Sequence, residues 1–340
     1  MADRRDFLRA AALLSLAPAL SGCERPPRPL PPQPWTERAH RRQPRSATAI
    51  LAAPAYDGTL VDLVRRGAEL CDLEVRGRRV VLKPNFVEFD PGGAINTHPA
   101  LITATIEAFR AMGAASVTVA EGPGHRRDTE YILSASGLDA VLRDTGARYV
   151  DLNVDRCRAF AAGSAYTSLE RLYLPDTISG ADLLVSMPKL KVHHWAGVTL
   201  SLKNMFGALP GAVYGWPKNV LHYAGLEQSI LDINATLTVP RFNIVDGIIG
   251  MEGDGPIRGD ARASGVLVFG RDPVAVDATA ARLMQLEPRR VWYLLQAGRF
   301  LGNLEAEQID QRGESIETFA QEYRLIDRLR YLRPSLHDVG

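Results

Sequence analysis

The stretch RVVLKPNFVEFDPGGAINTHPALITATIEAFRAMGAASVTVAE, residues 79–121, decides the fold class. Its short apolar start, residues 79–85, predicts a strand that a proline stops. Apolar residues at helical spacing follow Pro99 and predict a helix, and residues 116–120 predict a second strand. A strand, a helix and a strand within about 40 residues form a βαβ unit with two parallel strands.

Strands and helices continue to alternate on both sides of this unit. Apolar runs predict further strands over residues 48–53, 148–152, 172–178, 182–187, 242–249 and 265–269. Apolar residues at helical spacing predict further helices over residues 59–70, 129–144, 198–206, 226–237, 272–286, 289–298 and 316–329. This alternation predicts an α/β fold, with a mostly parallel sheet flanked by helices in a Rossmann-like layered architecture.

The chain divides into four predicted parts. Residues 1–23 predict an export signal, and residues 24–47, rich in proline and arginine, predict an extended linker. Residues 48–300 form the α/β body, and we expect a helical extension over 301–340. Within the body, residues 250–260 (GMEGDGPIRGD) predict a glycine-rich acidic loop.

The amino terminus has two features of an export signal. Arg4-Arg5 precedes a modest apolar run, which is typical of a twin-arginine export signal and too short to span a bilayer. Residues 20–23, LSGC, resemble a lipobox, in which cleavage leaves Cys23 lipidated. The prediction is export by the twin-arginine machinery to the periplasmic or extracytoplasmic face, where the lipid at Cys23 holds the protein to the membrane.

Composition excludes some classes of function. The formal net charge of +1 gives no support for nucleic-acid binding. The three cysteines include no CxxC pair, so no segment has the spacing of an iron–sulfur cluster or a structural zinc site. Cys71 and Cys157 either pair in an oxidising compartment or remain two separate thiols.

Lysine is rare in this chain, which has 35 arginines and five lysines. Four of the five lie within residues 186–219, and Lys83 lies in a second motif, LKPNF. Lysine offers a compact charge and an amine whose pKa falls on burial, whereas arginine offers a fixed planar fork. The remaining lysines therefore predict a site that needs an amine.

Polar residues follow several predicted strands. Lys83 and Asn85 follow one strand, Glu121 follows the next, and the segment KLKVHH, residues 189–194, follows another. Since ligands bind beyond the carboxyl ends of parallel strands, we expect these side chains to converge.

We assign roles by residue type. Lys189 and Lys191 share a face of an extended segment, and repulsion between two ammonium groups lowers one pKa, which suits a Schiff-base or general-base lysine. The candidate catalytic residues are Lys189, Lys191, His193 and Glu121. The candidate residues for binding an anionic small molecule are Lys83, Asn85, Lys203, Asn204 and Lys218.

Imidazole and carboxylate groups also suggest a metal. Nitrogen and oxygen ligands suit a transition metal or a divalent cation. The candidate ligands are His98, His194, Asp246, Glu252 and Asp254, although each fits an ordinary loop residue as well. No HExxH-like spacing supports the set, and the cofactor stays unknown.

Several segments resemble the domain of unknown function 362 family. They are VVLKPNF with NTHP, VAEGPG, LLVSMPKLKVHHWAGVTLSLKNMFG, NIVDGIIGMEGDGP and GRDPVAVDATAARLM, and they span about residues 80–286. Many members of that family carry an added ferredoxin-type iron–sulfur region, but this chain has no matching cysteines. The LKPN and Lys-His segments are also similar to nickel-dependent lactate racemases, which hold their metal cofactor with Lys and His.

Two functions remain open. One is an enzyme that acts on an anionic small molecule through lysine, histidine and acidic groups, with or without a metal or cofactor. The alternative is a non-catalytic periplasmic binding protein for an anionic ligand.

Overall fold

The computed structural model describes residues 33–36, 40, 42–124 and 128–334. The twin arginine and Cys23 lie outside the described residues, so the export prediction stays a prediction. In the described part, no helix is long and apolar enough to cross a membrane. Cys71 and Cys157 are free thiols, and Cys71 is buried.

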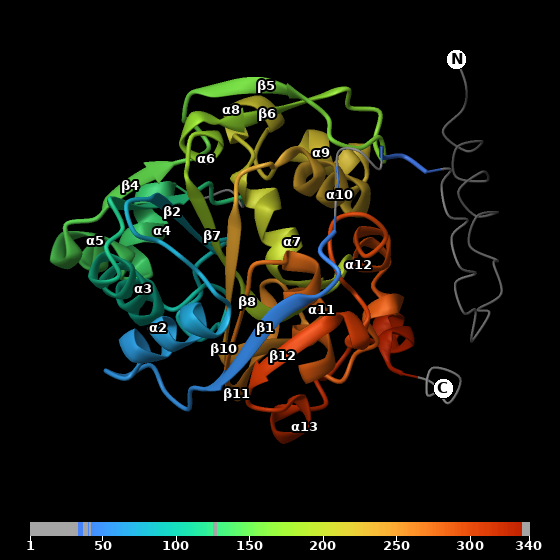
Figure 1. Ribbon diagram of the computed structural model, residues 1–340. Coiled ribbons are helices and arrows are strands. Elements are labelled where there is room, and N and C mark those ends of the chain that lie inside the picture. Colours follow the sequence, from blue (N-terminus) through green and yellow to red (C-terminus); the bar gives the residue numbers. More distant parts are fainter. Residues whose placement is uncertain (1–32, 37–39, 41, 125–127, 335–340) are drawn as a thin grey trace, which may run out of the picture. The chain divides into compact units, whose positions relative to one another are not determined.

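A mixed sheet of ten strands forms the centre of the body, in the order β12-β1-β11-β10-β7-β2-β3-β4, with β8 paired to β10 and β9 (Figure 1). The strands are β1 (Ser46–Ala52), β2 (Arg79–Pro84), β3 (Ser116–Glu121), β4 (Arg148–Asp151), β7 (Leu183–Met187), β8 (Lys189–His193), β9 (Gly197–Thr199), β10 (Arg241–Asp254), β11 (Arg258–Gly270) and β12 (Ile309–Gly313). A separate antiparallel pair consists of β5 (Cys157–Ala161) and β6 (Arg171–Pro175).

Helices cover both faces of this sheet. The α-helices are α2 (Leu60–Leu70), α3 (Pro99–Ala111), α4 (Thr129–Ala135), α5 (Leu138–Thr145), α6 (Asp176–Ser179), α7 (Ser201–Asn204), α8 (Gly211–Tyr214), α9 (Asn219–Ala224), α10 (Leu226–Thr236), α11 (Pro273–Leu283), α12 (Trp292–Ala297) and α13 (Ile316–Phe319). Short 3-10 helices lie at Met205–Ala208, Pro288–Arg290, Ala306–Gln308 and Asp327–Leu332.

Successive side chains of the strands point to opposite faces of the sheet and pack into two apolar cores. Leu82 and Val185 pack with α2 and α3 on one face, whereas Val81 and Leu184 pack with α10 and α11 on the other. Figure 1 shows these helices on opposite sides of the strands. Strands buried on both faces need helices on both faces, so the predicted layered α/β fold is confirmed.

The predicted βαβ unit is present, and its register sets the site. β2 runs parallel to both β3 and β7, with Leu82 opposite Val119 and Lys83 opposite Ser186. The carboxyl ends of these three strands therefore lie together, as the sequence predicts.

The structure differs from the expected loop over residues 250–260. β10 continues through Asp254 and pairs with β11 as an antiparallel hairpin. The glycines serve close packing rather than a loop, because a Cβ at Gly250 would lie 2.6 Å from the carbonyl oxygen of Leu190 in β8.

Other boundaries differ for local reasons. The predicted helix over 129–144 breaks at Gly137, whose φ of +77° ends α4. The predicted helix over 198–206 is instead β9 followed by α7 and a 3-10 turn. The expected helical extension over 301–340 contains β12, which pairs in parallel with β1 and so belongs to the main sheet.

Candidate functional site

A cavity of about 250 Å³ lies at the carboxyl ends of β2, β3 and β8. We call it the lysine cavity, because Lys83, Lys191, Lys203 and Lys218 line it. Among its described lining residues Glu121 is the one carboxylate. Four amines thus share a small space with a single acidic group.

Lys83 and Glu121 form a buried ion pair at the base of the cavity. The lysine Nζ donates to the two carboxylate oxygens at 2.7 and 2.8 Å, and each side chain is almost fully buried. The backbone N–H groups of Phe86 and Gly122 also donate to Glu121, at 3.0 and 2.8 Å. Burial lowers the pKa of Lys83 and raises the pKa of Glu121, and their contact opposes both shifts.

Asn204 connects this pair to the neighbouring strands. Its Nδ2 donates to the carbonyl of Lys83 at 3.1 Å and to Ser186 Oγ at 3.0 Å. Its Oδ1 accepts from Lys83 Nζ at 3.2 Å and from Asn85 Nδ2 at 3.3 Å. The Oδ1 of Asn85 has no hydrogen-bond partner in the described chain, nor does the hydroxyl of Thr199, and both residues line the cavity. Both oxygens are therefore buried and unpaired within the described part of the chain, in residues of the cavity wall.

Lys191 is completely buried and has a single hydrogen-bond acceptor among the described residues, the carbonyl of Ile95 at 2.9 Å. Burial places the pKa of Lys191 well below its usual value, and repulsion from Lys203 and Lys189 adds to the shift. A bound anion would reverse part of this shift by supplying the missing negative charge.

The contacts of His193, which lines the cavity, define the tautomer of its ring. Its Nδ1 accepts from the backbone N–H groups of Trp195 and Ala196, at 3.1 and 3.2 Å. Burial, followed by repulsion from Lys203, places the pKa of His193 well below its usual value, so the ring is neutral. The proton therefore sits on Nε2, and this N–H is a donor in a cavity that His193 lines.

Lys218 and Lys203 complete the cationic lining. Lys218 has φ of +67° and donates to Asn153 Oδ1 and to the carbonyl of Gly122. Lys203 lies 5.5 Å above the ring of Phe206. Burial lowers the pKa of each lysine to about 8, with a further contribution from Lys83 at Lys203.

Lys189 lies outside the lysine cavity, although the sequence analysis placed it among the catalytic residues. Its Nζ donates to Asp246 at 2.9 Å and to the Tyr56 hydroxyl at 2.8 Å, in a buried cluster. Tyr56 also donates to Asp246 at 2.7 Å, and its pKa is raised by burial and then by that carboxylate. Two acceptors thus hold the Lys189 amine, which gives this residue a structural role in the cluster.

Of the predicted metal ligands, His98 and Asp246 lie together, since the backbone N–H of His98 donates to Asp246 at 2.9 Å, and the other three make contacts elsewhere. His98 stacks on Tyr56 with ring centroids 3.8 Å apart, and its Nδ1 caps α3 by accepting from Ala100 N–H. His194 lies 3.2 Å from Asp254, while Glu252 accepts from the backbone N–H of Arg324. Among the residues that the structure describes, no three or more His, Cys, Asp or Glu side chains form a group that could hold a metal ion.

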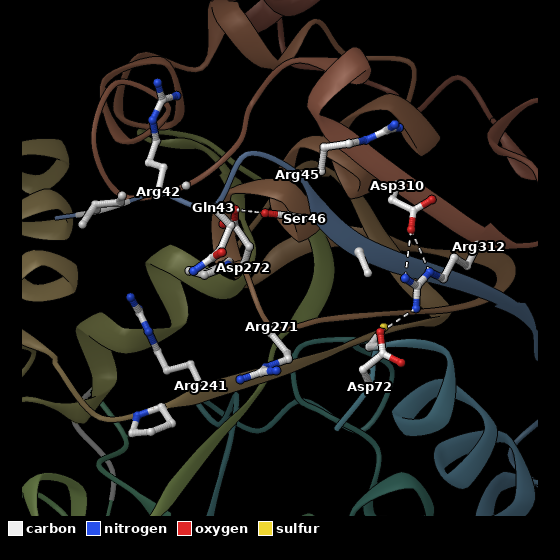
Figure 2. A pocket seen from close by; sticks show the side chains of 16 residues that line it. Arg42, Gln43, Arg45, Ser46, Asp72, Arg241, Arg271, Asp272, Asp310 and Arg312 are labelled. Carbon is white, nitrogen blue, oxygen red and sulfur yellow. Dashed lines mark hydrogen bonds and ion pairs between the residues drawn. The ribbon is translucent and has the colours of Figure 1, made fainter. Parts of the chain in front are cut away.

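A second, larger cavity of about 810 Å³ lies at the opposite, amino-terminal side of β10 (Figure 2). We call it the arginine cleft, because Arg42, Arg45, Arg241, Arg271 and Arg312 line it. Arg312 pairs with Asp72 and Asp310, and Asp272 caps α11 and accepts from Ser46 at 2.7 Å. In Figure 2 the guanidinium groups of Arg42, Arg45 and Arg241 lie apart rather than around one point.

The sequence analysis missed Thr199 and His222, which also line the lysine cavity. The Nδ1–H of His222 donates to the carbonyl of Lys218 at 3.0 Å, and the ring packs edge-on against Phe206. The proximity of His222 to Lys218 in the sequence was a usable signal. Thr199 gave none, because its segment was expected to be helical.

The family comparison matches residues 80–282 to the model described as "Domain of unknown function (DUF362)". This match confirms the resemblance found in the sequence motifs. The thylakoid-associated protein sll1697 of Synechocystis sp. is 28% identical over 221 residues, which are 63% of this chain and 65% of that protein. The chain thus spans a little under two thirds of the curated relative.

Two solved structures are similar. The lactate racemase apoprotein of Thermoanaerobacterium thermosaccharolyticum has a TM-score of 0.42 and 15% identity, over 72% of this chain and 58% of the other. A Thermotoga maritima protein from a structural genomics programme has a TM-score of 0.40 and 14% identity, over 68% and 60%.

Proposed function

The chain belongs to the family of the domain of unknown function 362, and from that premise we propose that its lysine cavity binds a small anionic molecule and performs acid–base chemistry on it. One observation carries the proposal: four lysine amines and a single carboxylate line about 250 Å³. Ligand cavities usually enclose about 300–1,000 Å³, so this one suits a ligand of few atoms.

The groups divide into two kinds. Lys191 and Lys218 have few acceptors of their own, so they bind the anionic group of the ligand, whose charge favours the protonated form of each amine. His193 donates its Nε2–H to an oxygen that gains negative charge during the reaction. Lys203, whose pKa is lowered to about 8, exchanges a proton near neutral pH.

The Lys83–Glu121 pair organises these groups. Gly207 lets the backbone lie against it, since a Cβ there would come within 2.9 Å of Glu121 Oε1 and 3.0 Å of Lys83 Nζ. The pair fixes Asn204 and, through it, the end of α7. It thereby keeps Lys203 at the cavity wall.

Calorimetric titration with oxalate, a small dianion, tests the binding step. We expect the protein to bind oxalate and Lys191→Met to weaken binding by about tenfold or more, since a hydrogen bond to a charged group contributes about 1.5–3 kcal/mol. Arg271→Met, in the arginine cleft, is the matched control and leaves the affinity unchanged. Failure of the wild-type protein to bind small anions would remove the proposal.

The chemical step separates the enzyme from the alternative, a non-catalytic binding protein. The readout is exchange of carbon-bound hydrogen for deuterium in small oxo and hydroxy carboxylates, followed by NMR in D₂O. Exchange that depends on Lys203 supports the enzyme. Anion binding without exchange or turnover of any such compound supports the binding protein.

A metal-dependent form of this site is a separate proposal. His193 fits a metal poorly in the observed geometry, because two N–H groups donate to its Nδ1 and leave the proton on Nε2. We therefore route no step through a metal. Elemental analysis of the purified protein tests the metal-dependent form directly.

Export and lipid anchoring are proposals that rest on the sequence around Arg4-Arg5 and Cys23. In cells, Arg4→Lys with Arg5→Lys is expected to retain the precursor inside. Cys23→Ser is expected to release the exported protein from the membrane fraction. An unchanged distribution in both variants would contradict the two predictions.

A further inference from the structure

We propose that Lys203 forms an imine with a small anionic carbonyl compound, such as an oxo acid, in the lysine cavity. This inference rests on the proposed function and names its substrate class. It follows from the contacts of the five lysines, taken one by one.

Four lysines are held by other groups. Lys83 donates to Glu121, Lys189 donates to Asp246, and Lys218 donates to Asn153. Lys191 donates to the carbonyl of Ile95 and is completely buried. Lys83 and Lys189 are thus held in ion pairs with carboxylates, and Lys191 and Lys218 are held by carbonyl or amide oxygens, so the protein rather than a ligand sets the orientation of these four amines.

Lys203 differs from the other four. It has no hydrogen-bond or ion-pair partner in the described chain, its side chain is partly exposed, and it lines the cavity. Its contact is with the face of the Phe206 ring at 5.5 Å. Attack on a carbonyl requires the neutral amine, and burial together with Lys83 lowers the pKa of Lys203 to about 8.

A buried carboxylate fixes the helix that carries Lys203. Asp277 of α11 accepts from the backbone N–H groups of Ser201 and Leu202 at 2.7 and 2.9 Å, at the first turn of α7. Asn204, the next residue, is fixed by its contacts to Lys83 and Ser186. The amine of Lys203 is thus attached to a backbone that is held at both ends, which lowers the cost of orienting it.

The step balances without any oxidant or reductant. The Nζ lone pair of Lys203 attacks the carbonyl carbon, and the carbonyl electrons move to oxygen, which takes a proton to give a carbinolamine. The nitrogen gives up its two protons, one at each stage, and forms C=N as the hydroxyl leaves with the second of them, so one amine and one carbonyl yield one imine and one water. The Nε2–H of His193, a residue of the cavity wall, is the donor that we assign to the oxygen. Lys191 and Lys218 bind the carboxylate of the same compound.

Reductive trapping tests the inference on the full chain. The protein is incubated with glyoxylate and sodium cyanoborohydride, which converts an imine into a stable carboxymethyl amine, and the adduct is located by peptide mass spectrometry. We expect a single lysine adduct, at residue 203, that oxalate suppresses. The chain has five lysines, so every one can be checked for an adduct. Lys189 is the internal negative control, because its amine is held in a buried ion pair with Asp246.

Lys203→Arg keeps the charge and removes the nucleophile. We expect it to lose at least 90% of the adduct, and oxalate binding is measured on the wild-type protein rather than on this variant. An adduct at another lysine, or none while oxalate binds the wild-type protein, overturns the imine and leaves the proposed anion site standing. Absence of both oxalate binding and adduct overturns the proposed function as well. The position of the adduct in the wild-type protein tests the imine even if the Lys203→Arg variant does not fold.

Discussion

The lysine cavity and the arginine cleft are both cationic, but they are built differently. The lysine cavity is small, its amines are mostly buried, and its one carboxylate is bound to Lys83. The arginine cleft is about three times larger, and Arg42, Arg45 and Arg271 are exposed along it. Its guanidinium groups spread apart in Figure 2, whereas the lysines surround one space.

The difference follows from the chemistry of the two side chains. A buried lysine can lose its proton, so several amines can share a cavity without an equal number of carboxylates. Arginine keeps its charge, and even for Arg241 burial lowers the pKa only to about 10. A chain that places lysine in the cavity and arginine in the cleft has separated titratable charge from permanent charge.

The largest expected effect comes from breaking the buried pair of the lysine cavity. Glu121→Gln leaves Lys83 buried without a carboxylate, and we expect a loss of about 3–5 kcal/mol in the free energy of unfolding. Asp72→Asn breaks an exposed pair of the arginine cleft and is expected to cost no more than about 1 kcal/mol. Urea denaturation measures both, and equal losses would show that the two regions do not differ as described.

A second effect concerns Asp277, which supports the helix of Lys203. Burial raises the pKa of this carboxyl to about 7 in the folded protein, above its ordinary value of 3.8. Between these values the folded state binds more protons than the unfolded state, so this group favours folding at low pH and the contribution is lost as pH rises through 7.

We therefore expect the stability of the wild-type protein, relative to Asp277→Asn, to fall between pH 4.5 and pH 8 by on the order of 2–4 kcal/mol. Urea midpoints of both proteins at the two pH values provide the measurement. Parallel curves for the two proteins would mean that Asp277 does not titrate in this range.

Anion binding should distinguish the two regions by pH. The pKa of Lys203 and that of Lys218 are each lowered to about 8, so both lose charge as pH rises from 7 to 9. We expect the affinity for oxalate to fall by about tenfold over this range, since each proton lost weakens attraction for the anion. Any anion bound by the arginine cleft should show no such fall, and calorimetry at both pH values separates the two cases.

Much of this site was predictable because strand ends can be located from sequence. The apolar run before Lys83 and the one before Glu121 are adjacent parallel strands, so their last residues had to meet. The pairing of these two residues in one ion pair follows from that register. The layered α/β fold was predictable for the same reason.

The position of Lys189 was not predictable in this way. It shares a strand face with Lys191, but the two residues are roughly 6.6 Å apart along the strand. That spacing brings Lys189 to Asp246 and Tyr56, and Lys191 to Ile95 at the cavity. The deciding partners come from remote segments, and β10 has an irregular register between Asp246 and Met251, opposite the two lysines.

The smallest expected effect is at Arg271, and it tests the permanent-charge side of the comparison. This side chain is exposed and has no ion-pair or hydrogen-bond partner among the described residues. Arg271→Ala removes a positive charge that forms no ion pair within the described chain. The urea midpoint and the oxalate affinity of this variant should therefore equal those of the wild-type protein within the error of measurement. A clear gain in stability would instead reveal repulsion with Arg45 and Arg241 across the cleft. The positive charge of the arginine cleft would then destabilise the fold, as that of the lysine cavity does. Such an excess of positive charge would indicate that the cleft binds an anionic ligand.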